Sequence, residues 1–491
     1  MKKFLRLAAL FLALLMISSC FAACKKDETQ DDEGGAQNSG VVSTSGGEYV
    51  SKLPAQKDFG GEEYLVLGQS GDANPAWRTF EISREELTDD VVGKAVWERN
   101  DAIKQKYNLI ISEELVTHSY QHIQTFYASN EDKYDMIMVQ LIGAFGHIQS
   151  GYHLDLTSVD YVDFEHPSWN DYTIEQFTFG DAVYMASSDF NLQNKAQLSC
   201  IFYNREMARD AGDGYLEDIV SADEWTLDKY NEIVSAYSED VSGNGVKGDE
   251  EDVFGSCGDM WNFLGFAAGA GYRASTVVDG NVQMAGAGDN ILNILDKVGK
   301  FFFNSQAHFI TEAKKPLDYY RSQNIFKDGR ALCFAGEIVD YDEGINEVSF
   351  EVGVLPFPKY DSAQKDHYTQ VNFAYSSLCA IPKTVFDVEL AGFGLQVLAE
   401  YSTDTTYEAY IETKCKLQDS FDQRMSDMYE IIFENPVYDL VILGDFGNIR
   451  RAMISEIPTS KQTSRYSTLY SAREESAQEE IDELKEDLGL N

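Results

Sequence analysis

Short apolar runs alternate with amphipathic stretches in the first third of the chain. Continuous apolar runs predict strands at residues 64–67, 109–111 and 136–139. Between these runs, residues 88–107 and 118–129 carry apolar side chains at helical spacing, and Thr88 stands where a helix cap is expected. The resulting β-α-β-α-β order predicts right-handed crossovers and a parallel sheet.

Polar residues follow two of the predicted strands. Ligands of parallel α/β sheets bind beyond the carboxyl ends of the strands, and these ends fall at residues 68–71 and 140–143. Gln69 and Gln140 are therefore candidate ligand-binding residues. Ordinary structural hydrogen bonding is the alternative for both side chains.

The remainder of the chain also alternates between helical and strand-like patterns. Thr226 is placed to cap a helix that starts near Trp225, and residues 352–356 form a short strand that ends in a proline-rich segment. Amphipathic stripes mark two further helices, one with Leu292, Leu295, Val298, Phe302 and Phe303, and a terminal one with Ala477, Ile481, Leu484 and Leu488 before Gly489. These patterns indicate an α/β fold with two lobes.

Composition narrows the range of partners. The 491 residues hold 82 acidic and 39 basic side chains, for a formal charge of −43. Such a chain repels phosphate backbones at long range, and no basic cluster stands out, so nucleic acid is excluded as an expected partner. The length predicts two or three domains.

The N-terminus resembles a bacterial lipoprotein signal. Three basic residues lie within the first six, and the apolar stretch at 7–17 is too short to span a bilayer comfortably. Cys24 is the expected lipidated residue because a charged run follows it directly, and Cys20 is the alternative. An ordinary secretory signal with incidental cysteines is the other interpretation.

This signal sets the expected location. Residues 1–23 would be removed, and residues 24–56, rich in small and polar side chains, would form a flexible tether. We therefore expect a lipid-anchored protein on the extracytoplasmic face of the cell membrane. The five cysteines beyond the signal lack CxxC spacing, which indicates neither a zinc cluster nor a disulfide framework.

The order of several segments resembles the extracellular solute-binding proteins of ABC importers, in the class that includes maltodextrin-binding proteins (family 1). The resemblance covers roughly residues 60 to 445. It rests on the segments at 201–205 with 211–212 (IFYNR, AG), 224–228 (EWTLD), 263–271 (rich in Ala and Gly), 326–331 with Gly336 (FKDGRA) and 354–358 (VLPFP).

The resemblance implies a type II periplasmic-binding-protein-like fold, with two α/β lobes joined by a hinge. It places the chain crossings near residues 188–198 and 355–359. Lobe one would comprise residues 57–190 and 356–410, and lobe two residues 195–354 and 411–491. It also implies a monomer that binds a carbohydrate or oligosaccharide between its lobes and delivers it to membrane permease subunits.

The resemblance and the local sequence also suggest ligand-binding residues. Sugars offer flat C–H faces and many hydroxyls, so their sites combine aromatic platforms with carboxylates and amides. Besides the two glutamines, the candidates are Trp169, Asp189, Trp261, Glu337, Tyr341 and Tyr375. For each of them a core or surface structural role is the alternative.

One short segment fits the twelve-residue calcium-loop pattern. Its ligands would be Asp240, Ser242, Asn244, the carbonyl of Val246 and Glu251, with Gly245 at the sharp turn. Ser242 is a weak replacement for a carboxylate, and Lys247 occupies a position that is usually apolar. A structural Ca²⁺ is therefore one interpretation, and a polar surface turn is the other.

Catalytic motifs are not apparent. The chain has no GxSxG elbow, P-loop, HExxH or dinucleotide fingerprint, so we expect a binding protein without a catalytic cofactor rather than an enzyme. Two other functions stay open from the sequence. A secreted polysaccharide hydrolase would need a carboxylate pair, and an adhesion or sensing lipoprotein would share the fold but lack a transporter.

Overall fold

The computed structural model describes residues 41–44, 47–73, 78–79, 82–84, 86–245, 251–278, 281–311, 321–415 and 423–490. The predicted signal peptide, both candidate lipidated cysteines and the first part of the predicted tether lie outside the described residues. The described residues from Val42 onward form one compact unit. Among the described residues, no helix has the length and apolar character needed to cross a membrane.

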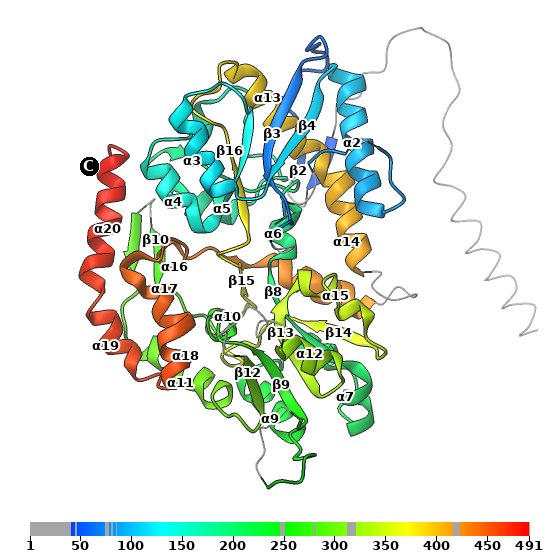
Figure 1. The fold of residues 1–491 in the computed structure, drawn as a ribbon, viewed down its shortest axis with the longest axis vertical. Coiled ribbons are helices and arrows are strands. Elements are labelled where there is room, and N and C mark those ends of the chain that lie inside the picture. Colours follow the sequence, from blue (N-terminus) through cyan, green and yellow to red (C-terminus); the bar gives the residue numbers. More distant parts are fainter. Residues whose placement is uncertain are drawn as a thin grey trace, which may run out of the picture. The chain divides into compact units, whose positions relative to one another are not determined.

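Lobe one is built on a four-stranded sheet with the strand order β16-β5-β3-β4 (Figure 1). Strands β4 and β5 both pair in parallel with β3, which confirms the predicted β-α-β-α-β order, whereas β16 is antiparallel to β5. The strands are β3 (Glu63–Gln69), β4 (Ile110–Val116), β5 (Met136–Gln140) and β16 (Ser377–Ala380). The helices of this lobe are α2 (Val91–Tyr107), α3 (Ser119–Ser129), α4 (Leu141–Gln149) and α13 (Val388–Ser402).

The N-terminal cap of α2 differs from the prediction. Asp90, not Thr88, accepts a hydrogen bond from the backbone N–H of Gly93, at 2.6 Å. Thr88 instead donates to the Asp90 carboxylate at 2.7 Å. A cap side chain must lie two or three residues before the N–H that it satisfies, so the cap belongs to Asp90 once the helix begins at Val91.

Lobe two is built on a five-stranded mixed sheet with the order β12-β9-β13-β8-β14. Strand β9 pairs in parallel with β12 and β13, and β8 is antiparallel to both β13 and β14. The strands are β8 (Ser199–Asn204), β9 (Phe254–Asp259), β12 (His308–Thr311), β13 (Ala331–Glu337) and β14 (Val352–Leu355). The helices include α7 (Arg205–Ala211), α8 (Leu216–Ser221), α9 (Leu227–Ala236), α10 (Asn262–Gly269), α11 (Asp289–Phe302) and α12 (Arg321–Lys327). Thr226 caps α9 by accepting from the N–H of Lys229 at 3.3 Å, as predicted.

The remaining described elements are short or lie between and around the two sheets. They are β1 (Val41–Thr44), β2 (Gly47–Val50), η2 (Leu156–Ser158), α5 (Asp171–Gln176), β6 (Thr178–Phe179), β7 (Ala182–Val183), α6 (Leu192–Ala196), β10 (Ser275–Val278), β11 (Asn281–Met284), η4 (Ile338–Tyr341), η5 (Ile345–Glu347), β15 (Thr369–Gln370), the π-helical turn η6 (Thr403–Tyr407), α14 (Glu408–Cys415), α15 (Gln423–Glu434), β17 (Pro436–Val437), α16 (Leu440–Gly444), η7 (Phe446–Asn448), α17 (Ile449–Arg451), the π-helical turn η8 (Ala452–Glu456), α18 (Ile457–Ser460), α19 (Arg465–Ser471) and α20 (Glu474–Asp487).

The predicted tether ends earlier in the structure than residue 56. Tyr49 donates its hydroxyl to Asp163, and Ser51 donates to the Glu400 carboxylate at 2.6 Å. Both partners belong to lobe one. Small polar residues around these positions suggested a flexible segment, but individual side chains there have specific partners on the folded body.

The chain returns to lobe one later than the sequence suggested. Residues 356–370 stay on lobe two, where the backbone N–H of Lys359 donates to the carbonyl of Trp225 at 3.1 Å. The Trp225 indole N–H also donates to the Pro356 carbonyl at 2.8 Å. These contacts hold the segment after β14 against α9, so the crossing lies between β15 and β16, near residues 371–376, rather than at 355–359. The earlier crossing runs through α6.

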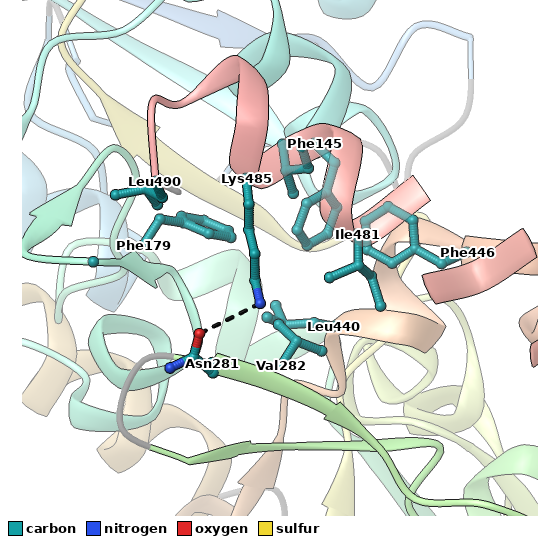
Figure 2. Close-up of a pocket in the computed structure, with 11 residues that line it drawn as sticks. Phe145, Phe179, Asn281, Val282, Leu440, Phe446, Ile481, Lys485 and Leu490 are labelled. Atoms are coloured by element: carbon teal, nitrogen blue, oxygen red, sulfur yellow. Dashed lines mark hydrogen bonds between the residues drawn. The ribbon is translucent and has the colours of Figure 1, made fainter. Parts of the chain in front are cut away.

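The C-terminal helices contact both lobes. In lobe one, the Gln149 side chain donates to Asp487 at 2.7 Å, and Phe145 packs edge-on against Phe446 with ring centroids 5.2 Å apart. In lobe two, Lys485 lies 3.4 Å from the amide oxygen of Asn281 (Figure 2). Apolar side chains from α4, the β6–β7 turn, β11, α16 and α20 surround a small cavity of about 90 Å³ at this place. A single buried apolar cluster therefore extends through both lobes.

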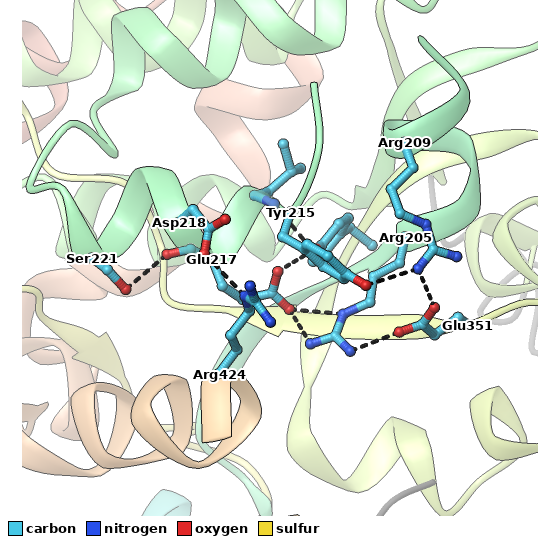
Figure 3. Close-up of polar contacts among 10 residues, drawn as sticks. Arg205, Arg209, Tyr215, Glu217, Asp218, Ser221, Glu351 and Arg424 are labelled. Atoms are coloured by element: carbon cyan, nitrogen blue, oxygen red, sulfur yellow. Dashed lines mark hydrogen bonds and ion pairs between the residues drawn. The ribbon is translucent and has the colours of Figure 1, made fainter. Parts of the chain in front are cut away.

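A buried ion network crosses the outer part of lobe two (Figure 3). The guanidinium of Arg205 donates to Glu217 from Nε at 2.9 Å and from Nη2 at 2.5 Å, and it donates to Glu351 from Nη1 at 2.9 Å. Tyr203 also donates its hydroxyl to Glu217. Arg205 and Glu217 are 2% and 0% exposed, so these two charges are compensated by each other rather than by water.

Candidate functional site

The crossing segment between β15 and β16 brings an edge of lobe one next to lobe two. The backbone N–H of Leu141, at the start of α4, donates to the carbonyl of Ser376 at 2.9 Å. The side-chain oxygen of Asn372 accepts from the N–H groups of Ala374 and Tyr375 at 2.9 and 3.2 Å, which fixes the local turn. Asn372 also donates to the Glu337 carboxylate at 3.2 Å, so this one side chain links the crossing to lobe two.

Three carboxylates gather at one edge of the lobe-two sheet. Asp259 ends β9 and Glu337 ends β13, and the two strands are parallel neighbours, so their carboxyl ends lie at the same edge. Asp340 follows in η4 and accepts from the Glu337 backbone N–H at 2.8 Å. Together they line a small cavity of about 20 Å³, which is room for about one water molecule.

Burial gives these three acids unusual proton affinities. Desolvation raises the pKa of Asp259 to about 6 and that of Asp340 to about 7. The pKa of Glu337 is also raised, by burial first and then by the charges of Asp340 and Asp259. No lysine or arginine lines this cavity among the described residues. Because these acids hold their protons to higher pH than ordinary carboxyl groups do, the cavity can offer a ligand both hydrogen-bond donors and acceptors.

An aromatic surface adjoins the acids. Asp259 accepts from the backbone N–H of Trp261 at 2.7 Å, which places this residue at the start of α10. The half-buried indole packs against Phe373 of the crossing segment, with ring centroids 5.2 Å apart. The guanidinium of Arg450 lies 4.5 Å from the centroid of the same phenyl ring. An aromatic platform, hydrogen-bonding acids and an amide therefore meet where the chain passes between the lobes.

A second and larger cavity lies beside the earlier crossing; we call it the hinge pocket. It has a volume of about 310 Å³, and its lining includes Trp169, Asp189 and Lys195. Trp169 is 4% exposed and donates its indole N–H to Gln396 at 3.2 Å. Thr403 donates to the Asp189 carboxylate at 2.8 Å. No residue that lines the three-acid cavity lines the hinge pocket.

The residues predicted from the sequence thus fall into separate groups. Trp261, Glu337 and Tyr375 lie around the crossing segment, and Gln140 ends β5 opposite Ser377, the first residue of β16 after the crossing. Trp169 and Asp189 line the hinge pocket instead. Tyr341 is 7% exposed and packs against Phe202, so it belongs to the core.

Gln69 has a structural role in place of the predicted ligand contact. It is 2% exposed, and its amide oxygen accepts from both the backbone N–H and the hydroxyl of Ser119, at 3.1 and 2.5 Å. The side chain thereby satisfies an N–H at the start of α3. A glutamine at the end of a strand meets the next helix as readily as a ligand, and only the tertiary structure distinguishes the two outcomes.

Sequence reasoning missed five residues of the site: Asp259, Asp340, Asn372, Phe373 and Arg450. A signal existed for two of them, because Asp259 lies two residues before the candidate Trp261 and Asn372 lies three before Tyr375. Phe373 follows Asn372 on the crossing segment, whereas Asp340 is brought in by η4 and Arg450 by α17, whose positions in space no local pattern gives.

The predicted calcium loop is described only in part. The Asp240 carboxylate accepts from the N–H groups of Gly243 and Gly245 at 2.7 and 2.9 Å. Ser242 and Asn244 are exposed, as is Glu251, whereas Val246 lies outside the described residues. In the part of the chain that the structure describes, no group of three or more His, Cys, Asp or Glu side chains is arranged so that it could hold a metal ion.

Replacing Asp259 with asparagine should make stability less dependent on pH. Folding raises the pKa of Asp259 from its ordinary 3.8 to about 6, so wild-type stability falls as pH rises through this interval. The asparagine side chain carries no charge and keeps an acceptor for the Trp261 N–H. We expect the variant to be more stable than wild type by about 1–2 kcal/mol at pH 8 and equal to it near pH 4. Thermal unfolding at pH 4, 6 and 8 measures the difference, and a gain that is constant over this range would contradict the assignment.

Several solved proteins share this fold. Substrate-binding protein Lmo0181 from Listeria monocytogenes, solved with cycloalternan, matches with a TM-score of 0.50 and 14% identity over 88% of this chain and 100% of its own. A cyclo/maltodextrin-binding protein solved with maltotetraose gives 0.52 and 12% over 87% and 97%. UspC of M. tuberculosis gives 0.51 and 14% over 85% and 100%.

Sequence comparison adds no closer assignment, because no family model and no curated protein matches the chain. At 12–14% identity the structural matches establish the fold. The chain therefore has a two-lobed, periplasmic-binding-protein-like α/β fold, as the sequence resemblance implied.

Proposed function

We propose that the protein is the substrate-binding subunit of an ABC importer and that it binds a carbohydrate or oligosaccharide between its lobes. The observation that carries this proposal is the juxtaposition of Trp261 and Phe373 with Glu337 and Asn372 at the crossing between the lobes. Aromatic faces stack on sugar rings, and carboxyl and amide groups bond to sugar hydroxyls. The shared fold supports the proposal, since two of the matching proteins were solved with oligosaccharides.

Titration calorimetry tests the ligand class directly. The chain from residue 25 retains every described residue and can be titrated with linear and cyclic glucans, other oligosaccharides, monosaccharides and peptides. We expect saturable heat with an oligosaccharide, together with a smaller radius of gyration in small-angle scattering as the lobes close. The absence of heat with every sugar at millimolar concentration would contradict carbohydrate binding. Recovery of the titrated sugar without chemical change would support a binding protein over a hydrolase.

The same proposal includes membrane attachment and delivery to a permease. The N-terminal signal supports lipidation at Cys24, which would hold the protein at the extracytoplasmic face of the membrane. Changing Cys24 to alanine should release the protein from the membrane fraction. If the variant remains attached, Cys20 becomes the site to change, and attachment of the double variant would contradict lipid anchoring.

We also propose that the loop from Asp240 to Glu251 can hold a structural Ca²⁺. The sequence spacing supports this, as does the tight turn at Gly245, which has a positive φ of 81°. Millimolar CaCl₂, but not MgCl₂, should then raise the melting temperature of wild type and not that of Glu251→Gln. Equal melting temperatures with and without Ca²⁺ would leave a polar turn as the only role of this loop.

A further inference from the structure

The hinge pocket contains two opposite charges that do not pair with each other. Lys195 and Asp189 both line the pocket, yet no salt bridge joins them, and no carboxylate among the described residues lies within 4.0 Å of the Lys195 amine. The amine instead lies over the rings of Tyr407 and Phe433, 5.2 and 5.5 Å from their centroids. One oxygen of Asp189 accepts from Thr403. The pocket therefore presents a cation and an anion with unused capacity.

The lining of the hinge pocket also contains a hydroxyl group that can donate a hydrogen bond to a ligand. The side chain of Tyr438 is 5% exposed and lines the pocket, but its hydroxyl has no hydrogen-bond partner among the described residues. Trp169 and Tyr407 contribute aromatic surface to the same cavity. A ligand here would find charge of both signs, a phenolic donor and apolar walls.

The charges of Asp189 and Lys195 are only partly compensated by their surroundings. Burial raises the pKa of Asp189 to about 6, with the positive charge of Lys195 opposing the shift. Burial also lowers the pKa of Lys195, against the influence of Asp189. A bound molecule that supplied an ammonium to Asp189 and a carboxylate to Lys195 would offset both effects.

We propose that the hinge pocket binds a small zwitterion, a free α-amino acid, with its ammonium group on Asp189 and its carboxylate on Lys195 and the Tyr438 hydroxyl. The volume of about 310 Å³ accommodates such a molecule and stands at the lower end of the range typical of ligand pockets. This site is separate from the three-acid cavity and from the Trp261 surface, so the proposal does not depend on sugar binding.

Calorimetry and thermal shift on the chain from residue 25 test the assignment without any sugar present. The probes are glycine, L-alanine, L-leucine and L-phenylalanine, with acetate and methylammonium as half-ligands and glucose as a neutral molecule. We expect at least one amino acid to bind saturably at millimolar concentration or below. The dissociation constant of each half-ligand should be higher by about tenfold or more. Failure of all four amino acids to bind would overturn the proposal, as would glucose binding more tightly than any of them.

Variants locate the site. Lys195→Met and Asp189→Asn keep the side-chain size and should each weaken amino-acid binding by about thirtyfold or more. Lys297→Met is the matched control, because Lys297 also lies over a tyrosine ring, 4.4 Å from the centroid of Tyr360, but outside the pocket. Circular dichroism verifies folding, and Tyr438→Phe, expected to weaken binding more modestly, provides a third variant. Affinity unchanged in both Lys195→Met and Asp189→Asn would overturn the assignment even if an amino acid binds.

Discussion

Replacing Glu217 with alanine is expected to lower the free energy of unfolding by about 3–5 kcal/mol. Glu217 is fully buried and accepts two hydrogen bonds from Arg205 and one from Tyr203. Without it, the Arg205 guanidinium would stay 2% exposed and depend on the partly exposed Glu351 for charge compensation. An undercompensated buried charge is far more costly than the loss of an average hydrogen bond, which accounts for the size of the effect.

A neighbouring ion pair provides the control. Asp218 follows Glu217 directly and pairs with Arg424 at 3.0 Å, but these side chains are 62% and 43% exposed (Figure 3). Asp218→Asn should therefore change stability by about 1 kcal/mol or less. Urea unfolding followed by circular dichroism compares the two variants. Similar losses for Glu217→Ala and Asp218→Asn would contradict the importance of burial.

The double replacement Arg205→Met with Glu217→Leu separates charge from packing. It removes both buried ions and leaves apolar side chains of comparable length, so we expect it to recover much of the stability lost in Glu217→Ala. A double variant as unstable as the single one would indicate that the geometry of the network, rather than an unpaired charge, determines stability here.

The sequence predicted the parallel core of lobe one well because its strands are continuous apolar runs. All four residues of Met136–Val139 are apolar, so we expect both faces of this strand to be buried. The structure buries them and pairs this strand with the one formed by 64–67. Helix boundaries were harder to predict, since Thr88 and Asp90 are both good cap residues and differ only in their distance from Gly93. The local pattern does not determine the residue at which the helix begins, and this starting point decides which of the two side chains reaches a free N–H.

The site was predicted only in part for a different reason. Trp261 and Glu337 stand next to recognisable segments. Phe373, which packs against Trp261, and Arg450, which lies over Phe373, come from regions more than 100 residues away from Trp261. The late crossing also depends on a tertiary contact, the hydrogen bond from Trp225 to the Pro356 carbonyl. Pro356 does end the strand, as its chemistry requires, yet the direction that the chain takes afterwards depends on what it meets in lobe two.

Replacing Trp261 with alanine should weaken sugar binding by about 30- to 100-fold if the proposed function is correct, because large aromatic side chains at binding sites contribute about 2–3 kcal/mol. The indole is half-buried beside Phe373, and its ring nitrogen has no hydrogen-bond partner among the described residues. It can therefore offer a ring face and a donor to a ligand without losing an internal contact. Calorimetry with the tightest sugar of the panel measures the change.

Two further variants decide how Trp261 would act. Trp97, also partly buried but located on α2 of lobe one, is the matched control, and Trp97→Ala should leave the dissociation constant unchanged. Trp261→Phe keeps an aromatic face and should retain part of the affinity that Trp261→Ala loses. Equal losses for Trp261→Phe and Trp261→Ala would assign the contribution to the indole N–H rather than to stacking. Unchanged affinity in Trp261→Ala, with the fold intact, would place the ligand elsewhere between the lobes, since a stacking platform cannot be removed without cost.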